Sequence, residues 1–220
     1  MPTYFAESLA QLKVFEACVP WMYLDSVGKV TVGVGLMLPN AAAACALGFT
    51  VAGVAASAEQ IGAEFARVAA LAPDKVPAFY RADTSPQLPQ EIIDAKLSAV
   101  LQGFEATIRG GIPGYDALPY VVKMALLDMA YNLGPAGLLK GYPKMLRAVE
   151  TGDWAQAASE CARGGIGAAR NAWTKQQFLS ATIAIISAEA EDEGRLFAHG
   201  VAGWFKSVWR RLRQLFSGSR

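Results

Sequence analysis

The chain has 220 residues, of which 53% are apolar and 18% are charged, and its net charge at neutral pH is +1. A chain of this length can bury a sizeable core and corresponds to one domain, or to one domain with an appendage. The small net charge gives no reason to expect a nucleic-acid partner. Much of the apolar excess is alanine, which favours helices rather than a membrane protein.

The cysteines and the histidine do not form a pattern of metal ligands. Cys18, Cys45 and Cys161 are widely spaced, and His199 is the only histidine. A structural zinc site needs four clustered cysteine or histidine ligands, so we expect no zinc site. We expect the three cysteines to be buried free thiols, because cysteine is among the residue types most often buried.

The N-terminal region predicts a helix followed by short strands. Residues 3–17 predict a helix that Thr3 caps, and they lack the basic start and apolar run of a signal peptide. Residues 21–38 alternate in polarity around a turn at residues 26–28, which predicts short β-strands. This is the only β patch that the sequence predicts.

The stretch 41–56 lies within a long uncharged run of the sequence. It is rich in alanine and glycine, and it is too short and too weakly apolar to span a bilayer comfortably. We expect a buried helix or a packed loop here, beginning with a short alanine-rich helix that Asn40 caps.

The remaining body predicts a series of helices. Ser57 and Gln60 have the spacing of a capping box. Residues 117–133 are apolar on nearly every side, which is typical of a central buried helix, and Gly134-Pro135 ends it. The other predicted segments are helices at 57–71, 89–109, 142–149, 153–162 and 167–191, and a loop at 73–89 with a short turn at 75–82. The predicted fold class is therefore α+β, mostly α, with a small N-terminal β-hairpin patch.

The C-terminal segment differs from the rest of the chain in charge. Residues 201–220 hold five of the 20 basic residues and none of the 19 acidic ones. Apolar side chains recur there at helical spacing, at Val201, Trp204, Phe205, Val208, Trp209, Leu212, Leu215 and Phe216. We predict a body at 1–198 and a basic amphipathic helix at 199–220. Three interpretations stay open: docking on the body, contact with a membrane or the bacterial envelope through 201–216, and binding to a partner protein.

Two carboxylates near the N-terminus are candidates for acid–base chemistry. Glu16 ends the first predicted helix, Asp25 lies in the turn nine residues later, and Thr31 is on the next predicted strand. Carboxylates on two elements can face each other across a cleft, where one protonates a glycosidic oxygen and the other acts on the water or the cation. From spacing alone, two solvated surface carboxylates remain the alternative.

The run from Glu16 to Gly35 has the form E-x8-D-x5-T-x-G-x-G, with Tyr23 two residues before the aspartate. It resembles the active-site signature of the phage-type lysozymes, which are the muramidases of glycoside hydrolase family 24. Residues 125–134 (ALLDMAYNLG) resemble the central helix of that family. A weaker third match is Gly152-Asp153-Trp154, followed by Arg170-Asn171. The three matches come in the family's order over about residues 5–190.

The resemblance implies a lysozyme-like fold with a helical lobe around a central buried helix. It also implies hydrolysis of the β-1,4 bond between N-acetylmuramic acid and N-acetylglucosamine in peptidoglycan, with inversion and without a metal or organic cofactor. By this resemblance Glu16 is the general acid. Asp25 activates the attacking water or stabilises the cationic transition state, and Thr31 positions that water.

The resemblance also assigns three supporting residues. Tyr131 and Asn132 would line the saccharide cleft, and the alternative for both is ordinary packing and capping at a helix end. Arg170 would pair with Glu16 and orient it, and the alternative is a solvated helix residue. Such an ion pair favours the charged form of Glu16, so the acid role needs the pair to loosen or desolvation to prevail.

The chain departs from the family pattern in four places. Ala17 stands where the family often has glycine, and Leu36 stands where it usually has histidine. Pro20 falls between the two carboxylates, and the insert 41–56 has no clear equivalent. We expect activity to survive these changes, with one hydrogen bond or ion pair lost at Leu36.

The absence of a signal peptide predicts synthesis in the cytoplasm and action on the cell wall in the bacterial periplasm after release or secretion. Release through a holin would make the protein a phage endolysin. Delivery by a contact-dependent secretion machine would make it an antibacterial effector with a cognate immunity protein. Two other function classes stay open: a non-catalytic peptidoglycan-binding protein, and a membrane-active protein that acts through its C-terminal helix.

Overall fold

A computed structural model describes residues 3–182. Of these residues, 62% are helical and 9% are in strands, so the α+β, mostly α fold class is confirmed. The predicted amphipathic helix at 199–220 lies outside the described residues, as does the end of the helix predicted at 167–191. Within residues 3–182, no helix combines the length and the apolar character needed to cross a membrane.

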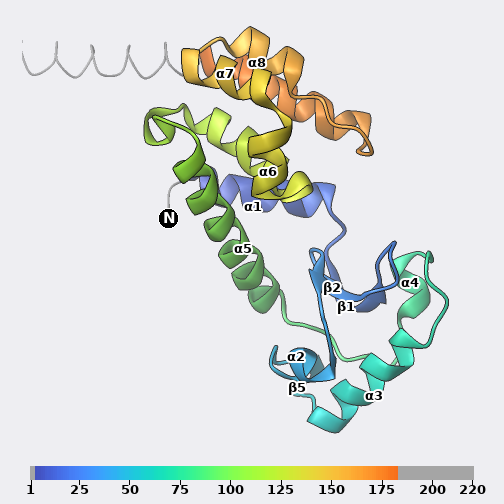
Figure 1. The fold of residues 1–220 in the computed structure, drawn as a ribbon. Coiled ribbons are helices and arrows are strands. Elements are labelled where there is room, and N and C mark those ends of the chain that lie inside the picture. The colour runs from blue at the N-terminus through green and yellow to red at the C-terminus, as the bar shows by residue number, and fades with distance from the viewer. Residues whose placement is uncertain (1–2, 183–220) are drawn as a thin grey trace, which may run out of the picture.

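Two hydrophobic cores divide the structure into a helical lobe and a sheet lobe (Figure 1). The helical lobe contains α1 (Thr3–Phe15), α6 (Tyr120–Gly141), α7 (Pro143–Thr151), α8 (Trp154–Glu160) and the helix at 168–182. The sheet lobe contains the strands together with α2 (Ala41–Cys45), α3 (Ala58–Ala69) and α4 (Pro77–Tyr80).

The long helix α5 (Gln90–Gly111) joins the two lobes (Figure 1). Ile93 and Leu97, near its start, belong to the core of the sheet lobe. Leu101 and Ile108, further along, belong to the core of the helical lobe. Because one continuous helix contributes to both cores, the packing of each lobe constrains the position of the other.

The main sheet is antiparallel, in the order β1 (Val19–Leu24), β2 (Val30–Gly33) and β3 (Leu36–Met37). Thr31 lies opposite Tyr23 on one side and opposite Met37 on the other. The register shifts between Val19 and Tyr23, around Pro20. Proline has no N–H to donate to a ladder, which accounts for an irregularity at that point.

The insert after β3 corrects one prediction. Asn40 caps α2 as predicted, and its side chain accepts a hydrogen bond of 2.9 Å from the Ala43 N–H. The rest of the insert is a second hairpin, β4 (Thr50–Val51) and β5 (Val54–Ala55), instead of a buried helix or packed loop. Only Ala44 and Phe49 are buried between residues 41 and 56. Short alanine- and glycine-rich strands lack the alternating polarity that identifies a hairpin.

Two helix-boundary predictions are confirmed by local geometry. Ser57 and Gln60 form both hydrogen bonds of a capping box at the start of α3. In α6, Gly134 has non-helical backbone angles, φ 71° and ψ 153°, where the predicted helix ends. The chain then resumes a short helical turn, which is why α6 extends to Gly141. The 3₁₀ helix at Tyr115–Ala117 precedes α6.

The prediction of three buried thiols is wrong for two of them. Cys161 is buried, and burial raises the pKa of its thiol. Cys18 and Cys45 are partly exposed, although all three are free. Cys18 follows the end of α1, at the junction between the lobes, where side chains are only half covered.

We predict that Gly33→Ala destabilises the fold. Gly33 has a φ of +67°, and an added Cβ would lie 3.2 Å from Ile93 Cγ2. The unfavourable backbone angle and the contact together should lower the free energy of unfolding by about 1–3 kcal/mol, measured by denaturant unfolding.

Gly62→Ala in α3 is the matched control, because an added Cβ there meets no atom within 4 Å. This change should raise the free energy of unfolding by about 0.5–1 kcal/mol. An equal loss of unfolding free energy in Gly33→Ala and Gly62→Ala would contradict the explanation from the backbone angle and the Ile93 contact.

Candidate functional site at the junction of the two lobes

Glu16 lies directly after α1, where the chain passes from the helical lobe to β1. Its N–H donates to the Leu12 carbonyl at 2.8 Å, so the helical hydrogen bonding extends to this residue. Its side chain is 35% exposed and forms an ion pair of 2.5 Å with Arg170 Nη1. The structure therefore brings together the predicted acid and the predicted arginine, which are 154 positions apart in the chain.

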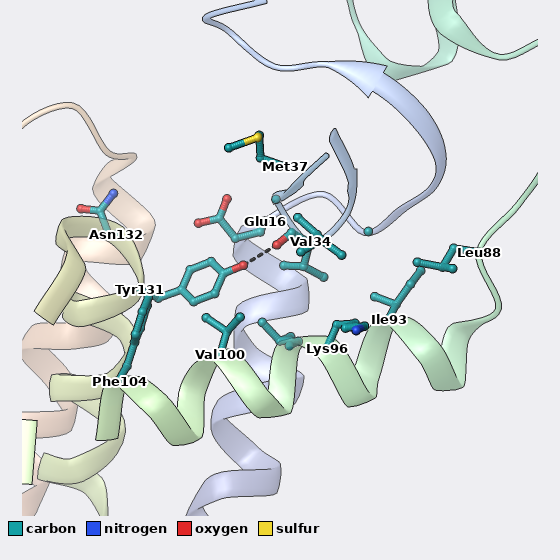
Figure 2. Close-up of a pocket in the computed structure, with 14 residues that line it drawn as sticks. Glu16, Val34, Met37, Leu88, Ile93, Lys96, Val100, Phe104, Tyr131 and Asn132 are labelled. Carbon is teal, nitrogen blue, oxygen red and sulfur yellow. Dashed lines mark hydrogen bonds between the residues drawn. The ribbon is translucent and has the colours of Figure 1, made fainter. Parts of the chain in front are cut away.

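A pocket of about 370 Å³ opens beside Glu16 (Figure 2). Three predicted site residues line it: Glu16, Tyr131 and Asn132. The rest of the wall is largely apolar and comes from the β2–β3 region and from one face of α5, including Val34, Leu36, Met37, Ile93, Val100 and Phe104. The pocket thus combines a few polar groups, from Glu16, Lys96, Tyr131 and Asn132, with an apolar wall, a composition typical of a ligand site.

Tyr131 connects the two lobes across this pocket. It lies on α6 and packs against both hydrophobic cores. Its hydroxyl donates a hydrogen bond to the Val34 carbonyl (Figure 2). Burial raises the pKa of Tyr131, and the nearby charge of Glu16 raises it further. Tyr131 therefore remains a neutral hydrogen-bond donor across the physiological pH range.

The second glycine of the T-x-G-x-G run lies next to Tyr131. Gly35 has a φ of +72°, and a Cβ at this position would lie 3.7 Å from the Tyr131 hydroxyl. Glycine adopts this backbone angle without strain. Both glycines of the run thus shape the turn that closes the pocket, Gly33 against α5 and Gly35 against α6.

Asp25 lies in the turn between β1 and β2 and is partly exposed. Its Oδ1 accepts hydrogen bonds from the backbone N–H groups of Val27 at 3.0 Å and Lys29 at 2.8 Å. This short-range arrangement fixes the carboxylate relative to the sheet. Asp25 does not line the pocket beside Glu16.

Thr31 is almost fully buried, at 2% exposure. Its hydroxyl donates to the Lys29 carbonyl at 3.0 Å, and it is not part of the pocket wall. Thr31 and Asp25 therefore share the backbone of Lys29 as a hydrogen-bonding partner, so the turn positions both side chains together.

The charges of both candidate carboxylates act on Tyr23. Burial and then the charges of Asp25 and Glu16 together raise the pKa of Tyr23 to about 12. Tyr23 is also opposite Thr31 in the sheet register. Both candidate carboxylates are therefore close enough to Tyr23 to act on its hydroxyl.

Behind Glu16 lies a buried cluster that sequence reasoning did not find. Arg170 Nε donates to Asp128 Oδ1 at 2.8 Å, and Arg163 Nη2 donates to Asp128 Oδ2 at 2.6 Å. The Thr174 hydroxyl is 2.9 Å from the same Oδ2. The available signal was an aspartate in the middle of the otherwise apolar helix α6, since a buried charge requires a partner.

The cluster keeps Arg170 charged despite its burial. Burial lowers the pKa of a guanidinium, but the charges and hydrogen bonds of Asp128 and Glu16 outweigh this effect and raise the pKa of Arg170. Among residues 3–182, no group of three or more histidine, cysteine or acidic residues is arranged to hold a metal ion.

Comparison with models of known protein families finds no match to this chain, and comparison with curated protein sequences finds none either. Any functional interpretation of the pocket consequently depends on its own residues and geometry.

We predict that the protein loses stability as the pH rises from about 10 to about 12, and that Tyr23→Phe weakens this dependence. A pKa of about 12 means that the folded state holds the Tyr23 proton more tightly than the unfolded chain, whose tyrosines titrate near 10. The stabilisation is complete below the unfolded pKa and is lost as the pH rises through the folded one.

The slope of unfolding free energy against pH should become shallower in Tyr23→Phe by up to about 1.4 kcal/mol per pH unit, measured by urea unfolding across this pH range. Tyr120→Phe removes a half-exposed tyrosine and is the control. An identical slope in wild type and Tyr23→Phe would refute the assignment.

Proposed function

We propose that this protein is a muramidase of the phage-type lysozyme kind, which hydrolyses the β-1,4 bond between N-acetylmuramic acid and N-acetylglucosamine. The observation that carries the proposal is the place of Glu16. It lies at the end of the first helix, on the wall of a pocket between two lobes, and it is paired with an arginine from the far end of the described chain. Tyr131 and Asn132 lie on the same pocket wall.

In this proposal Glu16 donates its proton to the glycosidic oxygen as the bond to the leaving sugar breaks. The product of that step is a glutamate carboxylate, which is the form that Arg170 binds. The ion pair therefore favours the products of proton transfer. The same ion pair opposes the protonation of Glu16 before the reaction, because Glu16 must then take up a proton beside a cation.

Asp25 is the proposed partner carboxylate. Its two backbone N–H bonds hold it in the turn and satisfy its anionic form. Thr31 is the proposed residue that positions the attacking water: its hydroxyl proton is donated to the Lys29 carbonyl, so Oγ1 would accept from the water, and its 2% exposure means that this role requires a local opening of the site. With the water on the opposite face of the sugar from Glu16, the proposed reaction inverts the anomeric centre.

Two biological settings agree with this chemistry. A phage endolysin would reach the periplasm through a holin, and its gene would lie near holin and spanin genes. A secreted antibacterial effector would be encoded beside a small immunity gene. In either setting the proposed substrate is peptidoglycan, and the basic segment 201–216 would add contact with the anionic envelope.

We predict that Glu16→Gln reduces muropeptide release from purified peptidoglycan by about 10²–10⁴-fold, the usual loss when a general acid is removed. Soluble fragments with reducing muramic ends would be separated by liquid chromatography. Glu7→Gln is the matched control, because Glu7 is an exposed carboxylate on the same helix, α1. Thermal unfolding would show that both variants are folded.

Equal release by wild type and Glu16→Gln would refute the role of Glu16. Release by neither would refute the muramidase proposal and favour the binding or membrane-active alternatives. Deleting residues 201–220 separates those two. A membrane-active protein would lose lysis, and a binding protein would still sediment with peptidoglycan.

We predict that Asp25→Asn lowers the rate of hydrolysis by at least about 10²-fold while the turn remains intact. Asparagine keeps a side-chain oxygen that can accept from the Val27 and Lys29 N–H groups, but it removes the charge and the base. Asp83→Asn, at an exposed loop position of the same lobe, is the control. A rate within about twofold of wild type would exclude Asp25 from the reaction, since a general base contributes far more than this.

A further inference from the structure

We propose that Asp128 and Arg163 are positioning residues that act through Arg170 and set the pH at which Glu16 gains and loses its proton. The effect on Glu16 protonation follows from the buried cluster alone. Its meaning for catalysis rests on the proposed muramidase function.

The four groups form one connected chain of charges. Arg163 donates to Asp128, Asp128 accepts from Arg170, and Arg170 donates to Glu16, with N–O distances of 2.6, 2.8 and 2.5 Å. The Arg163 side chain is 0% exposed, Asp128 is 3% exposed and Arg170 is 9% exposed. Only Glu16, at 35%, reaches the pocket. Water therefore screens the first three charges less than it screens charges at the surface, so they influence Glu16 more than surface charges at the same distance would.

The charges in this chain balance only when Glu16 is ionised. Two arginines face a single aspartate, so the cluster without Glu16 carries one net positive charge in a buried place. The hydrogen bonds show the same imbalance: Arg163 Nε and Arg170 Nη2 are buried and have no hydrogen-bond partner among the described residues. An anion next to an uncompensated buried cation is favoured over its neutral form.

Two tyrosines near Glu16 are neutral in the acidic and neutral range, whereas Lys96 and Asp25 are charged groups. Tyr23 from β1 and Tyr131 from α6 both have a raised pKa, so neither carries charge there. Lys96 from α5 lines the same pocket, and Asp25 and Cys18 act on Tyr23. None of these belongs to the buried cluster. Lys96 and Asp25 are the same in wild type and in the Asp128 and Arg163 variants, so a difference between variants arises in the buried cluster.

The two partners should act in opposite directions. Asp128→Asn removes the anion that shares Arg170 with Glu16, so Arg170 pairs more strongly with Glu16. Glu16 then loses its proton at a lower pH. Arg163→Met removes the second cation, so Arg170 becomes the only cation that is paired with Asp128. Arg170 then attracts the Glu16 carboxylate less strongly. The proton of Glu16 is then retained to higher pH. A merely structural role would not give shifts of opposite sign.

The test follows the side-chain carboxyl carbon of Glu16 by NMR in the full chain labelled with ¹³C-glutamate, with Glu16→Gln used to assign the resonance. We expect the titration midpoint to move down in Asp128→Asn and up in Arg163→Met, each by at least about half a pH unit. Arg163→Lys should restore the midpoint, because it keeps the charge. Thr174→Val is the control, since it removes hydrogen bonds to the same cluster without changing its charge.

Shifts of opposite sign, with little change in Thr174→Val, would support the proposal. Shifts of the same sign, or a midpoint in Thr174→Val that moves as far as the others, would overturn it. If Asp128→Asn does not fold, the comparison of Arg163→Met with Arg163→Lys decides alone: an upward shift in the first that the second reverses supports the proposal, and equal midpoints overturn it.

The NMR titration also separates this proposal from the muramidase proposal. If hydrolysis is present, its alkaline limit should move with the NMR midpoint in each variant, and a limit that does not move would overturn the catalytic part. If the midpoints shift as expected but wild type releases no muropeptides, the proposed effect of Asp128 and Arg163 on Glu16 protonation is supported and the muramidase function is refuted.

Discussion

Burial of the Arg170 guanidinium is the constraint on which the site depends. A buried cation is tolerated only beside anions, and here one comes from α6 and the other from the end of α1. Arg170 thereby joins three segments that are far apart in the chain. It also leaves Glu16 as the exposed end of a buried ionic chain, on the wall of a pocket. The packing that completes the helical lobe thus also places the candidate acid.

The sheet lobe is held against this centre by a different interaction. Tyr131 reaches from α6 to the Val34 carbonyl, and α5 contributes side chains to both cores. The tight turn after β2 makes this approach possible, because Gly33 and Gly35 adopt positive φ angles beside α5 and α6. The pocket consequently has walls from both lobes, and a relative movement of the lobes would change its width.

The ionic chain also bears on the chemistry that we propose. A general acid must be protonated before the reaction, whereas Arg170 favours the carboxylate that remains afterwards. In our proposal the charges behind Glu16 set the balance between these demands. Asp128 removes part of the positive charge that the two arginines would otherwise present to it. Tuning of an acid by groups that never reach the substrate is a general feature of sites built on buried charges.

The short-range interactions of this chain could be predicted from neighbouring residues alone. The capping box of Ser57 and Gln60, the cap at Asn40 and the end of the helix at Gly134 depend on residues at most a few positions apart, and each lies where predicted. The helical and alternating patterns along the chain predicted the fold class, and one motif identified Glu16, Asp25 and Thr31 as candidates. Tertiary structure decided the burial of Asp128 beside Arg163, 35 positions away, and the second hairpin, whose short strands carry little pattern of their own. Local hydrogen bonds can be read from neighbouring residues, whereas the partner of a buried charge is known only once the chain has folded around it.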